Sequence, residues 1–85
     1  MPAPIEVILY GRPGCTLCVE AERMLERIGK RIALHVRNVN IEGDDDLLRR
    51  FMFEIPVVEA AGRVLATAPV REGALEDALE ALATD

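Results

Sequence analysis

The fold is decided by the stretch GRPGCTLCVEAERMLERI, residues 11–28, in which two residues separate Cys15 from Cys18. These are the only two cysteines of the 85-residue chain. The apolar run IEVILY, residues 5–10, comes just before it and is typical of a strand buried on both faces. GRPG has the composition of a turn, and from Cys15 onward the apolar residues follow helical spacing. The cysteine pair is therefore predicted where a strand turns into a helix.

The rest of the chain predicts a strand over 32–41, a helix beginning near 44–46, two short strands around a glycine-containing turn over 55–66, and a helix over 72–83. The first strand, helix and strand have the spacing of a right-handed βαβ unit with parallel strands. The order β-α-β-α-β-β-α predicts one α/β domain spanning residues 1–85. Its four-stranded mixed sheet should have the first strand in its interior and helices on both faces.

Composition narrows the possible partners and the compartment. The formal net charge is −5 and the sequence pI about 4.8, so we expect neither nucleic acid nor an anionic membrane as a partner. No apolar run is long enough to cross a bilayer, and the N-terminal sequence has no secretory-signal pattern. We therefore expect a cytoplasmic protein. Thiols are kept reduced there, which favours a catalytic, redox or metal-binding role for the pair over a structural one.

The position of the pair favours thiol chemistry. The thiolate is the nucleophile in disulfide exchange, and Cys15 lies where free backbone N–H groups and the helix dipole stabilise an anion. Arg12 adds a positive charge nearby, so we predict a pKa for Cys15 below that of an ordinary thiol. Cys18 lies one helical turn further on and should be less exposed. We assign attack to Cys15 and resolution of the mixed disulfide to Cys18, a reaction that requires no metal or organic cofactor.

Other interpretations of these residues stay open. A structural zinc site needs four ligands, whereas the two cysteines and His35 are the whole supply of soft ligands. A metal shared between two chains, or two inert cysteines, remains possible. Asp44–Asp46 is interpreted as helix capping rather than a calcium site, and His35 as a surface residue. Tyr10 either lines the site or packs in the core, where Met24, Met52 and both phenylalanines are also expected.

Three segments give the chain a resemblance to the thioredoxin superfamily, and within it to glutaredoxin-like proteins. They are ILYGRPGCTLC, VNIEGDDDLLRRF and EIPVV, and the resemblance that they carry covers nearly the whole chain. The third is similar to the T-V-P segment of the family, in which the proline is cis and faces the redox cysteines. The resemblance implies a thioredoxin fold, a cis peptide bond before Pro56, and a backbone at Ile55 that pairs with an extended substrate chain.

The sequence also departs from the glutaredoxin pattern. The usual C-P-Y-C is C-T-L-C here, and ATAPVREGA, residues 66–74, lacks the Gly-Gly pair whose amides hold a carboxylate of glutathione. Pro69 removes a further amide there. Arg12 and Arg71 can supply positive charge instead, and Thr67 a hydroxyl. Substrate contacts are predicted for Arg12, Thr16, Ile55, Pro56 and Thr67.

The leading hypothesis is a small, monomeric thiol–disulfide oxidoreductase that contributes to electron transport and cell redox homeostasis. Its substrates would be disulfide-containing proteins or glutathione mixed disulfides. Its external reductant would be glutathione or a thioredoxin-type protein. The missing Gly-Gly pair and the unusual Thr16-Leu17 motivate an alternative, a thioredoxin-like binding module without turnover. A dimeric metal or iron–sulfur carrier is the third hypothesis.

Overall fold

The structure is a computed structural model, and it describes residues 3–84. The strands and helices follow the predicted order, with a short 3-10 turn added before the second helix. They are β1 (Ile5–Gly11), α1 (Thr16–Ile28), β2 (Leu34–Asn40), η1 (Ile41–Gly43), α2 (Asp45–Phe51), β3 (Val57–Ala60), β4 (Arg63–Ala66) and α3 (Glu72–Ala83).

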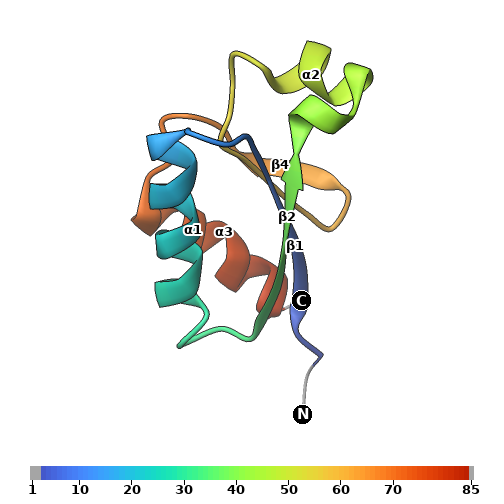
Figure 1. The fold of residues 1–85 in the computed structure, drawn as a ribbon. Coiled ribbons are helices and arrows are strands. Elements are labelled where there is room, and N and C mark those ends of the chain that lie inside the picture. Colours follow the sequence, from blue (N-terminus) through green and yellow to red (C-terminus); the bar gives the residue numbers. More distant parts are fainter. Residues whose placement is uncertain (1–2, 85) are drawn as a thin grey trace.

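The strands form one mixed sheet in the order β2-β1-β3-β4 (Figure 1). β1 pairs in parallel with β2 from Ile5 opposite Leu34 to Gly11 opposite Asn40. It pairs antiparallel with β3, which in turn forms a hairpin with β4. β1 thus lies in the interior of the sheet, as its hydrophobic sequence predicted, and the α/β fold class is confirmed.

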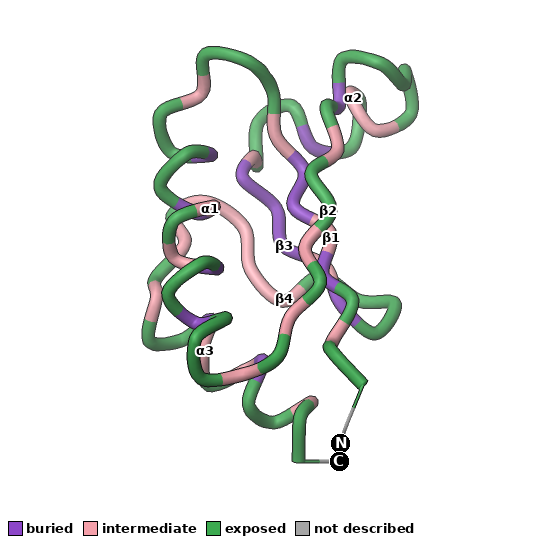
Figure 2. The backbone as a smooth tube through the Cα atoms, turned by 60° about the horizontal axis from the view of Figure 1, so that its bottom comes forward, coloured by how far each residue is buried: buried purple, intermediate pink, exposed green. Residues whose placement is uncertain are grey.

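Helices α1 and α3 cover one face of the sheet and enclose the larger core (Figure 1). The helices contribute their apolar stripes, and β1 and β3 contribute alternate residues. Buried positions lie along β1 and β3 and recur on α1 and α3 (Figure 2). The buried members of this core are Val7, Leu9, Ala21, Leu25, Ile28, Val58, Ala60, Leu75 and Leu79.

A smaller core lies on the opposite face, beneath α2. Tyr10 and Val57 are paired across β1 and β3 and point to this face, because neighbouring residues of a strand alternate between faces. Phe51 and Ile41 complete the buried cluster, and the rings of Tyr10 and Phe51 lie 4.8 Å apart, centroid to centroid. Helices on both faces of the sheet were predicted, and Tyr10 belongs to this core.

The second strand is shorter than the predicted range of 32–41. At its start, the backbone N–H of Ile32 donates to the carbonyl of Ile28, so the chain is still leaving α1. At its end, the Asn40 side chain accepts a hydrogen bond from the N–H of Glu42 and begins the 3-10 turn. The next helix starts as interpreted, since Asp44 accepts from the N–H groups of Asp46 and Leu47.

The prediction that both phenylalanines and Met52 lie in the core is wrong in part. Phe51 is buried, but Met52 is exposed and Phe53 has 90% of its surface exposed. The physical reason is the end of α2 at Phe51, whose carbonyl accepts hydrogen bonds from Glu54 and Ile55. This turn breaks the helical period, so the two following apolar side chains leave the buried face.

Candidate functional site at the start of helix α1

Cys15 and Cys18 form a disulfide at the amino end of α1, with their Cα atoms 5.2 Å apart. Cys15 is the N-cap residue, and its Sγ accepts a hydrogen bond from the backbone N–H of Cys18 at 3.1 Å. Cys15 is half-buried, whereas Cys18 is 9% exposed and belongs to the core. The predicted difference in exposure is therefore observed. The more accessible sulfur is also the one held by a helix N–H group.

The turn before the pair depends on one glycine. Gly14 has a φ of +77°, in the left-handed region that side chains disfavour. A Cβ atom added there would meet nothing within 4 Å, so the requirement for glycine comes from the backbone and not from space. This turn delivers Cys15 in the extended conformation of a helix N-cap, with φ −92° and ψ 105°.

An open groove of about 480 Å³ lies beside the disulfide. It is formed by the carboxyl ends of the parallel strands β1 and β2, the turn, and the first turns of α1. Two predicted substrate contacts, Arg12 and Thr16, line it and are exposed. The complete lining is Leu9, Gly11, Arg12, Pro13, Gly14, Cys15, Thr16, Cys18, Val19, Glu22, Asn38, Val39 and Asn40.

The sequence prediction missed the polar wall of this groove. Asn38 donates a hydrogen bond from Nδ2 to Oε2 of Glu22 at 2.9 Å, which links β2 to α1. Asn38 lies opposite Leu9 and Asn40 opposite Gly11 in the parallel register. The carboxyl ends of parallel strands meet at one edge, so the βαβ prediction contained a signal for both asparagines. Their position in the same groove as the cysteines depends on the register between β1 and β2, which the sequence leaves open.

The other predicted contacts lie outside the groove lining. Pro56 is buried and Ile55 is half-buried against the smaller core. The peptide bond between them is cis in the structure, the geometry that the resemblance implies. Thr67 is half-buried after β4. The next residue, Ala68, donates its N–H to the carbonyl of Glu54 at 3.0 Å, which ties this segment to the residues before Pro56.

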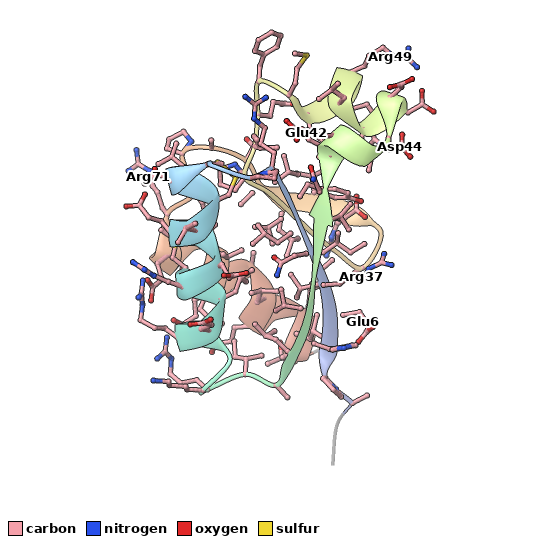
Figure 3. All side chains as sticks on the ribbon, viewed as in Figure 1. Glu6, Arg37, Glu42, Asp44, Arg49 and Arg71 are labelled. Atoms are coloured by element: carbon pink, nitrogen blue, oxygen red, sulfur yellow. A yellow bond between two sulfur atoms is a disulfide. The ribbon has the colours of Figure 1, made fainter. Side chains whose placement is uncertain are left out.

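Two features near α3 concern the absent Gly-Gly pair. The Ala68–Pro69 bond is also cis, which the sequence did not predict. Arg71 is the N-cap residue of α3, where its side chain makes no capping hydrogen bond. Figure 3 shows Arg71 at the end of the molecule where α1 begins. Its side chain is exposed, so it remains available for an anion outside the groove.

Tyr10 and His35, the two other side chains considered for the site, both have partners elsewhere in the structure. The Tyr10 hydroxyl donates a hydrogen bond to Oε1 of Glu59 at 3.2 Å. The pKa of Tyr10 is raised, mainly because the hydroxyl is buried and secondly because the negative charge of Glu59 lies beside it. Nδ1 of His35 lies 2.8 Å from Oε2 of Glu6 on the exposed surface of the sheet. Neither Tyr10 nor His35 lines the groove.

Residues 3–84 contain neither a cluster of metal ligands nor a membrane-spanning helix. In this range, no three or more histidine, cysteine, aspartate or glutamate side chains are grouped so that they could hold a metal ion. None of the helices described has both the length and the apolar character needed to cross a membrane.

Solved structures of other proteins share the fold of this chain. Among solved structures, protein Ne2328 from Nitrosomonas europaea is similar over 93% of this chain and 95% of its own, with 26% identity and a TM-score of 0.82. Protein XcR50 from X. campestris is 29% identical over 88% of this chain and 96% of its own, with a TM-score of 0.77.

A more distant likeness shows the fold alone. Thioredoxin 1 from Thermosipho africanus TCF52B is 12% identical over 91% of this chain and 97% of its own, with a TM-score of 0.58. No curated protein matches the sequence. The thioredoxin fold with a C-x-x-C pair suggests a capability for redox chemistry. Residues 6–80 match the model of the protein family described as "Glutaredoxin-like domain (DUF836)". The chain therefore belongs to that glutaredoxin-like family.

Proposed function

We propose that this protein is a thiol–disulfide oxidoreductase that cycles between the Cys15–Cys18 disulfide and the dithiol. The observation that carries the proposal is the hydrogen bond from the Cys18 N–H to Sγ of Cys15 at the amino end of α1. The same N–H and the positive end of the helix dipole stabilise a thiolate at Cys15. Cys15 is also the less buried of the two cysteines, which suits the residue that attacks the substrate.

The reaction proceeds in two exchanges. In the reduced protein, the Cys15 thiolate attacks one sulfur of a substrate disulfide, forms a mixed disulfide, and expels the other substrate sulfur as a thiolate. The Cys18 thiolate then attacks Sγ of Cys15, closes the internal disulfide, and releases the second substrate thiol. Two electrons pass to the substrate, and the two cysteine protons balance the released thiols. An external dithiol, or two monothiols, returns the protein to the reduced form.

The groove supports a place for the substrate beside Cys15. Arg12 is the one cationic residue in its lining and is suited to a carboxylate, while the Thr16 hydroxyl can donate or accept a hydrogen bond. Val19 and Val39 supply apolar surface. The proposed substrates are disulfide-containing proteins or glutathione mixed disulfides.

The proposed substrate site extends beyond the groove. The resemblance assigns the backbone of Ile55, beside cis Pro56, to an extended substrate chain, and the Thr67 hydroxyl is a further proposed contact. We further propose that glutathione or a thioredoxin-type protein is the reductant, and that the protein acts as a cytoplasmic monomer. The exchange itself uses only the two cysteines and needs no metal or organic cofactor.

The test is a disulfide-exchange assay on single serine variants. Cys15→Ser should lose exchange at least a hundredfold, because the attacking sulfur is gone. Cys18→Ser should keep the first step and accumulate a mixed disulfide, visible as an adduct on Cys15 by mass spectrometry. His35→Asn, a substitution at an exposed residue outside the groove, is the matched control and should retain activity.

Full exchange activity in Cys15→Ser would contradict the proposal. If instead a protein partner is captured equally well by the wild type and by the double serine variant, the result favours the binding-module hypothesis. That hypothesis requires recognition without turnover, so it predicts no dependence on either sulfur.

A further inference from the structure

Gly11, the last residue of β1, lies against the buried cysteine. A Cβ atom added at Gly11 would lie 3.0 Å from Sγ and 3.2 Å from Cβ of Cys18. Distances of 3.0–3.4 Å are tighter than nine in ten real Cβ contacts. The backbone of Gly11 has no positive φ, unlike that of Gly14. The requirement for glycine at position 11 therefore comes from space beside a sulfur and not from chain conformation.

Neither partner in this contact can easily move away. Gly11 is held in the parallel ladder opposite Asn40. Cys18 lies in the first turn of α1, where its N–H is bound to Sγ of Cys15 and its side chain is buried. Interiors are packed closely, so a shift of strand or helix would disturb the core between them.

The contact with the sulfur depends on the redox state, whereas the contact with Cβ does not. In the disulfide, Sγ of Cys18 is bonded to Sγ of Cys15 and cannot rotate away from residue 11. In the dithiol that bond is absent, and Sγ is free to occupy another staggered rotamer. A side chain at position 11 would therefore crowd the oxidised protein more than the reduced one.

We propose that Gly11 is a positioning residue for the redox couple: the absence of its side chain leaves the space that Sγ of Cys18 needs in the disulfide form. The size of residue 11 then sets the equilibrium between disulfide and dithiol. This inference rests on the proposed function, since it concerns the same pair of cysteines. Gly11→Ala should shift the equilibrium toward the dithiol and make the protein the stronger oxidant.

The test measures this equilibrium in wild type, Gly11→Ala and Gly43→Ala. Each oxidised protein is equilibrated with glutathione, so that two thiols reduce one protein disulfide and yield one glutathione disulfide. The thiols are then trapped and weighed by mass spectrometry. We expect Gly11→Ala to favour the dithiol about tenfold, which equals about 30 mV for a two-electron couple. Gly43→Ala should match wild type, because a Cβ atom there meets nothing within 4 Å.

The outcomes separate this inference from the proposed function. A wild-type pair that never forms a disulfide defeats both. A wild-type pair that cycles normally, with the same equilibrium constant in Gly11→Ala, defeats only the role of Gly11. A shift toward the disulfide would also overturn that role.

A second experiment keeps the inference testable if Gly11→Ala fails to fold, by comparing the stability of this variant in two backgrounds. If the Cys18 sulfur causes the crowding, Gly11→Ala should destabilise the oxidised wild type more than it destabilises a Cys18→Ala background. Equal destabilisation in the two backgrounds, or a double variant that still fails to fold when Cys18→Ala alone folds, would contradict the inference. Urea unfolding of the four proteins supplies the measurement.

Discussion

At the scale of single residues, the chemistry depends on what surrounds each sulfur. Both cysteines line the open groove, but Cys15 is half-buried and its Sγ accepts a helix N–H, whereas Cys18 is buried against Gly11. This difference is the one that the proposed roles require, with Cys15 reacting with substrates and Cys18 with its neighbour. This division follows from a separation of two residues at the amino end of a helix.

The environment of Cys15 in the reduced protein favours the thiolate over the thiol. A hydrogen bond from a backbone N–H and the helix dipole both favour the anion, so the pKa of Cys15 should lie below the value of about 8.5 for a free cysteine. The rate of alkylation as a function of pH in the Cys18→Ser variant measures this pKa without interference from the second thiol. A midpoint at or above that of a free cysteine would contradict the prediction.

At the scale of elements, two ion pairs on the surface connect α1 and the turn after it to α3. Arg27 of α1 binds Glu72 with Nη2 and Oε1 2.6 Å apart, and Arg31 of the following turn binds Glu76, one turn further along α3. These arginine hydrogen bonds are the largest cause of the lowered pKa values of Glu72 and Glu76. Ion pairs on the surface therefore add to the packing of the larger core in holding α1 next to α3.

The lowered pKa values fix the pH dependence of these pairs. A carboxylate whose folded pKa lies below its ordinary 4.5 stabilises the fold above that value, and the contribution is lost as the pH falls through the folded pKa. The variant with Arg27→Ala and Arg31→Ala should be less stable than wild type at pH 7, and the difference should shrink below pH 4.5. Thermal unfolding across this range tests it. A difference independent of pH would contradict the assignment.

Sequence patterns predicted the helices and strands well wherever one hydrophobic pattern extended along the whole element. The helix over 72–83 and the interior position of β1 are observed as predicted, because a long amphipathic stripe or a strongly hydrophobic strand has few alternative placements. Short elements were less predictable. Phe53 is apolar but exposed, since α2 has only 7 residues and ends before the stripe can continue.

The site was predictable in its cysteines but not in its walls. The spacing of Cys15 and Cys18 is local and was visible in the sequence. The groove depends on the register between β1 and β2, which brings Asn38 and Asn40 opposite the end of β1. The sequence fragments alone do not define that register. The close approach of Gly11 to Cys18 likewise arises only when strand and helix are packed together.

At the scale of the whole molecule, the disulfide lies at the end of an interior strand that is packed on both faces. The larger core holds β1 against α1 and α3, and the smaller core holds it against α2 (Figures 1 and 2). The strand and the first turn of α1 are therefore fixed by most of the buried surface of a small domain. Under the proposed function, a rigid frame of this kind would let a buried and a half-buried cysteine exchange electrons without rearranging the fold.

The central claim is that Cys15 and Cys18 form a working redox pair, and one measurement tests it directly. The wild-type protein is equilibrated in a graded series of glutathione redox buffers, its thiols are trapped, and the species are weighed. We predict that the internal disulfide forms and disappears reversibly, with a midpoint in the range of about −180 to −270 mV that covers many thiol exchangers. If neither an internal disulfide nor a glutathione adduct on Cys15 appears anywhere in the series, the claim is contradicted.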